Sequence, residues 1–177
     1  MKLTLDYVII AATVLLLVTS VYTDVRHRKI YNAVTVPFAV IGLGLNVYAR
    51  GWWGILFTVE GIALGLALFF LSAFLGRILG AGDCKLFAAV GALQGPQMLV
   101  WCILYALVAG GVIALFVALF RGVLRPALTR VWQSLYMRAY HKMPMDITSS
   151  AEQMRLPYAT AIAVGTLLAM WQYHGQF

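Results

Sequence analysis

The chain has 177 residues, of which 63% are hydrophobic and 11% are charged, and its formal net charge is +7. A water-soluble domain carries about a quarter of its residues as charged side chains, so this composition excludes a cytosolic globular enzyme. It also excludes a disordered chain and a charge-rich coiled coil. The sequence therefore predicts one all-α, polytopic integral-membrane domain over residues 1–177.

Six apolar segments follow along the chain, and a membrane span needs about 20 such residues. They cover residues 5–23, 33–48, 53–79, 83–93, 97–120 and 157–171. The fourth is only about 16 Å long at 1.5 Å per residue, so we expect a short or partly re-entrant helix there. Counting it gives about six transmembrane helices. Pro37 predicts a kink in the second.

A basic stretch, residues 121–156, separates the last two segments. Its apolar residues recur at helical spacing between arginines, which predicts an amphipathic helix lying on the cytoplasmic face of the membrane. Ser149 and Glu152 match a capping box and predict the start of a second short helix. We expect no separate soluble domain.

Basic residues gather on one side of this topology, and Lys2 and Arg50 stand alone on the other. Eleven of the 13 fall in the first, third and fifth loops: Arg26, Arg28, Lys29, Arg77, Lys85, Arg121, Arg125, Arg130, Arg138, Lys142 and Arg155. Because basic loops stay in the cytoplasm, we expect these loops inside and both termini outside. The same rule accounts for the net charge, so no nucleic-acid partner is expected.

Two cysteines, Cys84 and Cys102, are far apart, with no CxxC pair and no histidine cluster. This spacing predicts neither a disulfide framework nor a zinc site. Both are expected to be small packing residues. We expect no metal and no cofactor.

Among the 6 acidic residues, Asp6, Asp146 and Glu152 are expected to be solvated. Asp24 follows the first span and precedes several cations, so on its own it is a surface acid that balances them. Asp83 closes the sequence Gly-Ala-Gly-Asp at the start of the fourth segment. On its own it is an N-cap, because aspartate accepts hydrogen bonds from free amides at a helix start.

Taken together, Asp24 and Asp83 suggest chemistry, since the predicted topology brings both to the cytoplasmic rim of the bundle. Two carboxylates that share a site do not easily both ionise, so one keeps its proton. The ionised partner can deprotonate a water while the protonated partner polarises a scissile carbonyl. The sequence therefore predicts an aspartic-peptidase dyad and leaves open which residue is the acid.

Glu60 competes as a functional acid, because an acid inside a membrane span is a functional candidate. It follows Trp53 by seven residues, which places it near the outer face, far from the proposed dyad. We interpret it as a structural hydrogen-bonding or helix-contact residue.

Three blocks in this order resemble the type IV prepilin peptidase family: Asp24 with the basic residues and Ile30-Tyr31-Asn32 that follow it, Gly80-Ala81-Gly82-Asp83-Cys84-Lys85-Leu86, and Leu156-Pro157-Tyr158-Ala159. The resemblance covers residues 23 to about 165. It implies that Asp24 and Asp83 are the catalytic residues of a bacterial inner-membrane peptidase facing the cytoplasm. The implied substrate is a prepilin, cut next to a glycine between a basic leader and a hydrophobic helix.

Several residues beside the dyad have two interpretations. Gly80 and Gly82 allow positive φ and let the extended leader approach the acids. Lys85 lowers the pKa of Asp83 or contacts the leader, or is simply a lysine at an inner rim. Asn32 caps the second helix or hydrogen-bonds near Asp24. Tyr158 presents its hydroxyl to the site or belongs to the interfacial aromatic belt.

The larger members of the family carry a cytoplasmic insertion with paired CxxC motifs and also methylate the new pilin N-terminus. Here only residues 23–31 join the first two spans, so the chain resembles the compact peptidases of Tad/Flp pilus systems. This implies cleavage without N-methylation. Two other hypotheses remain, an ion-coupled transporter and a non-catalytic assembly component. Prepilin and membrane lipids are the expected partners, and the sequence does not indicate an oligomeric state.

Overall fold

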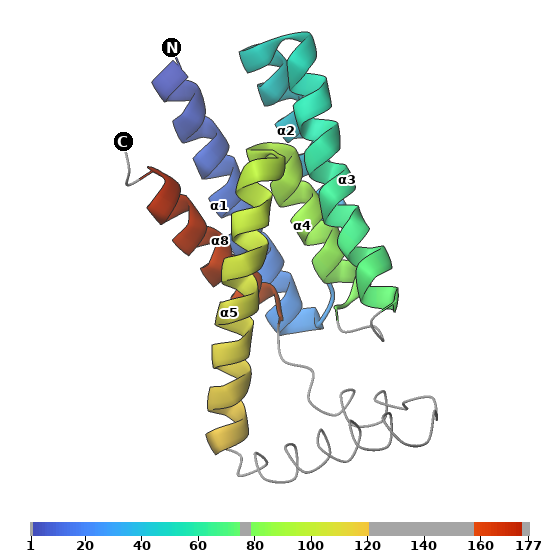
Figure 1. Ribbon diagram of the computed structural model, residues 1–177, viewed down its shortest axis with the longest axis vertical. Coiled ribbons are helices and arrows are strands. Elements are labelled where there is room, and N and C mark those ends of the chain that lie inside the picture. Colours follow the sequence, from blue (N-terminus) through green and yellow to red (C-terminus); the bar gives the residue numbers. More distant parts are fainter. Residues whose placement is uncertain (1, 75–78, 121–157, 175–177) are drawn as a thin grey trace. The chain divides into compact units, whose positions relative to one another are not determined.

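The computed structural model describes residues 2–74, 79–120 and 158–174 (Figure 1). Every regular element in these ranges is a helix, which confirms the all-α prediction. They are α1 (Lys2–His27), α2 (Asn32–Arg50), α3 (Trp52–Phe74), α4 (Ala81–Gln94), α5 (Pro96–Phe120) and α8 (Tyr158–His174). The predicted amphipathic helix and the capping box at Ser149 lie outside the described residues.

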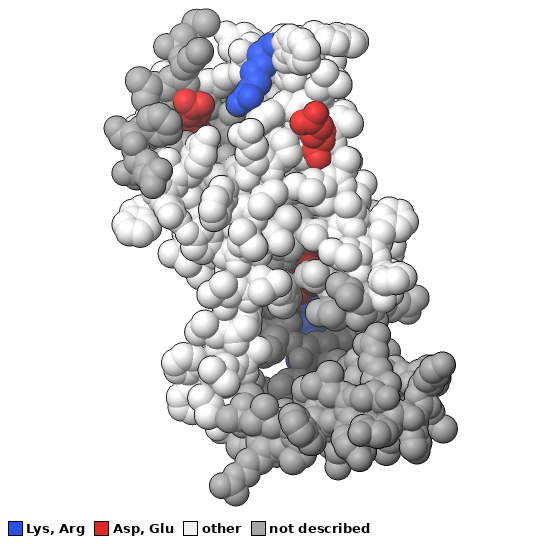
Figure 2. Space-filling view, in the orientation of Figure 1, with Lys and Arg blue, Asp and Glu red and all other residues white. Residues whose placement is uncertain are grey.

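Within the described residues, four helices are long and apolar enough to cross a membrane: Thr4–His27, Asn32–Arg50, Trp52–Phe74 and Pro96–Val117. The face in Figure 2 carries only isolated charged side chains on an otherwise uncharged described surface, as a lipid-facing protein should. With 14 residues in α4 and 17 in α8, both are shorter than a typical span. The count of six spans therefore stays a prediction, as do the orientation and the position of the termini.

Two of the predicted helix boundaries are wrong. α1 continues to His27, so Asp24 lies inside its last turns instead of following the helix. The predicted third segment ran to Leu79, but α3 ends at Phe74 and Leu79 is not helical. An apolar run shows which residues lie within the membrane, whereas backbone hydrogen bonds determine where a helix ends. The two limits differ in both cases.

The chain forms two compact units, residues 1–109 with 157–177 and residues 110–156. In the first unit, α1 and α8 lie side by side and run in opposite directions (Figure 1). The same view shows α2 and α4 running parallel to α8. The end of α1 and the beginnings of α2, α4 and α8 therefore meet at one end of this unit.

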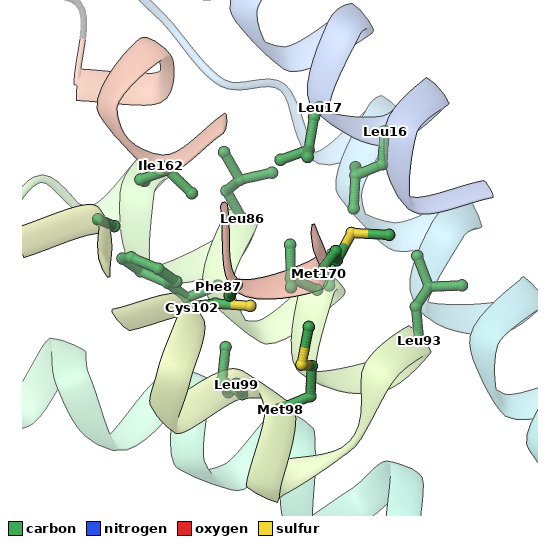
Figure 3. Packing of buried hydrophobic residues seen from close by; sticks show 14 of the residues in the cluster. Leu16, Leu17, Leu86, Phe87, Leu93, Met98, Leu99, Cys102, Ile162 and Met170 are labelled. Atoms are coloured by element: carbon green, nitrogen blue, oxygen red, sulfur yellow. The ribbon is translucent and has the colours of Figure 1, made fainter. Parts of the chain in front are cut away.

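The short helix α4 is the centre of the first unit, where it contacts α1, α2, α3 and α8. All but one of its residues from Cys84 to Leu93 are buried, the exception being Lys85. Figure 3 shows how Leu86 and Phe87 of α4 meet side chains of α1, α5 and α8. Cys84 and Cys102 are both buried and free, as predicted.

Glycines allow the backbones of these helices to approach closely. A Cβ at Gly61 of α3 would collide with the backbone of Gly91 in α4, and one at Gly65 would collide with Ala88. Small residues at helix contacts are the usual means of close packing in membranes, where lipid tails compete for apolar surface.

Polar groups hold the C-terminal end of α4, whose last carbonyls lack partners within the helix. The buried amide of Asn46 in α2 donates to the carbonyls of Ala92 at 3.0 Å and Leu93 at 3.3 Å. Gln94 donates to the hydroxyl of Thr13 in α1 at 2.9 Å. These bonds fix α4 at the end opposite Asp83.

Candidate active site

Asp24 joins two helices that are far apart in sequence. Its partly buried carboxylate accepts a hydrogen bond from the backbone N–H of Ala159, with 3.2 Å between nitrogen and oxygen. Ala159 lies in the first turn of α8, where backbone N–H groups have no partner within the helix and favour a negative charge. Asp24 is therefore more than a surface acid balancing nearby cations.

Asp83 lies in the first turn of α4 and reaches back toward the residue before the helix. The N-cap is Gly80, whose backbone N–H donates to the Asp83 carboxylate at 3.2 Å. The interpretation of Asp83 as the N-cap is thus wrong, because Asp83 lies three residues after the N-cap. An acid at this third position still satisfies one free amide and suits the helix dipole, as in half of a capping box.

The pKa of Asp83 is raised from its ordinary value of 3.8 to about 6. Burial is the largest cause, since it disfavours the charged carboxylate. The hydrogen bond from Gly80 acts in the opposite direction and lowers this pKa, while the negative charge of Asp24 raises it again. Asp24 and Asp83 are therefore close enough to interact electrostatically, and Asp83 exchanges its proton near pH 6.

Gly80 and Gly82 leave room for side chains instead of permitting unusual backbone angles. Gly80 has φ −69°, and Gly82 is helical, so the expectation of positive φ is wrong. A Cβ on Gly80 would stand 3.0 Å from the Asp83 Oδ2 atom, and one on Gly82 would stand 3.3 Å from Cβ of Ile30. The glycines thus let Asp83 fold back and let the α1–α2 link pack against α4.

Lys85 and Asn32 connect the beginnings of α4 and α2. The Lys85 ammonium donates to the Asn32 Oδ1 atom at 2.9 Å. Asn32 is not the cap of α2, because Tyr31 holds that position and makes no side-chain cap bond. Asn32 instead fixes α4 relative to the link that follows Asp24, a contact that neither position indicates on its own.

Tyr158 is the first residue of α8 and is partly buried. Its pKa is raised, first by burial and then by the negative charge of Asp83. The phenol therefore lies within electrostatic range of Asp83, next to the amide that binds Asp24. Of its two interpretations, this position favours the one in which Tyr158 faces the site.

Ser72 is a residue that the sequence did not single out. Its hydroxyl donates to the Leu79 carbonyl at 3.1 Å and accepts from the Leu79 amide at 2.8 Å. These two bonds tie the end of α3 to the residue before Gly80. In the sequence Ser72 is only an isolated serine in an apolar run, and this pattern does not indicate that it binds the backbone of Leu79.

Comparison with known proteins shows the family of this chain. Residues 10–115, more than half of the chain, match the type IV leader peptidase family. The chain belongs to this family. It is 28% identical over 106 residues to the prepilin peptidase EppA of Methanococcus maripaludis, an alignment covering 60% of this chain and 29% of that protein. This chain therefore matches less than a third of that relative's length. No solved structure matches it.

The family match contains both candidate aspartates of this chain, and it ends before Tyr158 and Ala159. Tyr158 of α8 was a candidate from the sequence, whereas the hydrogen bond from the Ala159 amide is seen only in the tertiary structure. The peptidase classification is consistent with two interacting carboxyl groups beside a helix N-terminus, one of which exchanges its proton near pH 6.

The remaining acids lie away from this arrangement. Glu60 is exposed on α3 and makes no hydrogen bond to another described residue. The hydrogen-bonding interpretation of Glu60 therefore finds no partner among the described residues, and the helix-contact interpretation stays a prediction. Asp6 is exposed, as predicted, whereas Asp146 and Glu152 lie outside the described residues.

Proposed function

We propose that this chain is an integral-membrane aspartic endopeptidase that removes the basic leader from prepilins at the cytoplasmic edge of the membrane. Membership of the leader peptidase family supports the peptidase class. The electrostatic interaction of Asp24 with a half-buried Asp83, whose pKa is about 6, is the observation that carries the mechanism.

In the proposed reaction the two carboxyl groups share one proton. Asp24, which accepts a hydrogen bond from the Ala159 amide at a helix N-terminus, acts as the base and removes a proton from the attacking water. In the reactive form of the enzyme Asp83 carries the proton and donates a hydrogen bond to the scissile carbonyl oxygen, on which negative charge develops. Collapse of the tetrahedral intermediate breaks the C–N bond, and the amine leaves with a proton from the dyad. The pair titrates as a unit.

The substrate chemistry is a basic leader followed by a hydrophobic helix. The similar protein EppA is described as a prepilin peptidase, which supports this class. We further propose the compact Flp-type activity, with cleavage but no N-methylation. Only four residues link α1 to α2, which leaves no insertion between these helices to carry a second activity.

The test is to co-express the protein with a prepilin and follow leader removal by gel shift and mass spectrometry. Asp24→Asn and Asp83→Asn should each abolish cleavage while the protein is still inserted and folded. Asp6→Asn, which changes an exposed acid at the other end of α1, is the matched control and should cleave normally. Cleavage that persists in either dyad variant excludes the mechanism, and a methylated product excludes the Flp-type assignment.

A further inference from the structure

An open apolar groove of about 650 Å³ runs between α1 and α8. On α1 its wall is one face of the helix, whose apolar residues recur at helical spacing: Val14, Leu17, Val18, Val21, Tyr22 and Val25. On α8 it is formed by Ala163 and Leu167, which lie one turn apart. Two parallel ridges with a hollow between them make the surface into which a third helix packs.

One end of the groove lies close to the candidate active site. Val25 in its wall is the neighbour of Asp24, and Ala163 lies one turn after Ala159, whose amide binds Asp24. A helix lying in the groove would therefore end beside the carboxylate that is proposed to activate water.

We infer that this groove binds the hydrophobic helix that follows the cleavage site of the substrate. The inference rests on the proposed function, because that substrate is cut immediately before such a helix. A helix seated between the two ridges extends toward Asp24, so the bond preceding it arrives at the dyad. The position of the bound helix in the groove, and not the length of the leader, thereby determines which peptide bond is cut.

The chemistry of the walls suits this occupant. The single charged residue of the lining, Arg26, stands on α1 beyond Asp24, where it repels a basic leader and keeps it out of the groove. Between helices in lipid, association depends on close packing, and a small residue such as Ala163 permits it. The leader is then directed away from the groove, past the start of α4.

Filling the groove tests the inference. Ala163→Leu adds bulk to the α8 wall of the groove, whereas Ala67→Leu makes the same change at an exposed position of α3. Each variant is assayed with a complete prepilin and with a short peptide that carries the leader and cleavage site but lacks the helix. We expect Ala163→Leu to raise KM for the complete prepilin about tenfold or more, with kcat unchanged. The short peptide should be cleaved as by the unchanged enzyme, and Ala67→Leu should alter neither substrate.

An equal loss on both substrates, or no loss on either, overturns the inference, since bulk in the groove would then act through Asp24 or not at all. Cysteine cross-linking gives a second measurement that needs no turnover. In an Asp83→Asn background, Leu167→Cys should cross-link to a cysteine in the substrate helix, and Leu66→Cys on α3 should not. Equal cross-linking at both positions, as expected if the groove holds only lipid, also overturns it. Failure of the unchanged protein to cleave prepilin overturns the proposed function instead, so the two failures are distinct.

Discussion

The carboxylate of Asp24 binds the backbone amide of Ala159, 135 residues further along the chain, across 3.2 Å. This bond joins the last turns of α1 to the first turn of α8. Asp24 therefore has two roles, because the carboxylate proposed to activate water also binds the N-terminus of α8. The position of α8, and with it Tyr158, thus depends on the same carboxylate.

The first prediction is that the catalytic and the structural role of Asp24 can be separated by substitution. Asp24→Asn keeps a side-chain carbonyl that accepts the Ala159 amide, whereas Asp24→Ala removes the acceptor. Both variants should be inactive, but only Asp24→Ala should lose about 1–2 kcal/mol of unfolding free energy, the usual effect of deleting a helix-capping group. Thermal unfolding in detergent measures the difference. Equal stability of the two variants would contradict the structural duty of Asp24.

The protonation of Asp83 is the second prediction. Because its pKa is about 6, the infrared carbonyl band of a protonated carboxyl group should persist well above pH 4 and disappear as the pH passes 6. The band should be missing in Asp83→Asn. In Asp24→Asn the negative neighbour is gone, so the midpoint should move to lower pH. An unchanged midpoint would show that the two aspartates do not interact.

A third prediction concerns stability. Above pH 6 the buried Asp83 is ionised at a cost, whereas below about pH 4 it is protonated in both folded and unfolded states and the cost vanishes. Asp83→Asn keeps the acceptor for Gly80 without the charge, so it should be more stable than the unchanged protein by up to about 3 kcal/mol above pH 6. The advantage should shrink as the pH falls through 6 toward 4. A variant that is less stable at pH 7.5 refutes this account.

Coupling between Lys85 and Asn32 is the fourth prediction. A double-mutant cycle with Lys85→Met and Asn32→Ala should give a coupling free energy of about 0.5–1 kcal/mol, because the bond is exposed to solvent. Lys29→Met, which alters another exposed lysine near the site, should show no coupling to Asn32→Ala. Additive effects of the first pair would mean that this bond does not hold α4 to α2.

Helix packing provides the fifth prediction. Gly61→Ala places a Cβ against the backbone of Gly91, so it should destabilise the protein and reduce cleavage by displacing α4. Gly44→Ala is the matched control, because a Cβ there meets nothing within 4 Å and alanine favours the helix by about 0.5–1 kcal/mol. Opposite signs of the change in melting temperature are expected, and equal signs would contradict the packing of α3 on α4.

Composition and apolar runs were sufficient to predict the all-helical membrane class, because the solvent around a chain must match its surface. The Gly-Ala-Gly-Asp block likewise indicated the start of a helix and, by resemblance, the peptidase family. Helix boundaries were less accurate, as at Phe74, since hydropathy marks membrane depth while backbone hydrogen bonds end a helix.

Three relationships were decided only by the tertiary structure: the Asp24–Ala159 bond, the Lys85–Asn32 bond and the apolar groove between α1 and α8. Each joins positions more than 50 residues apart, or faces of two different helices. A linear pattern records which residue types a helix offers, but the partner of each depends on how the helices cross. The two aspartates and Tyr158 could be named from the sequence, whereas the Ala159 amide and the groove required the fold.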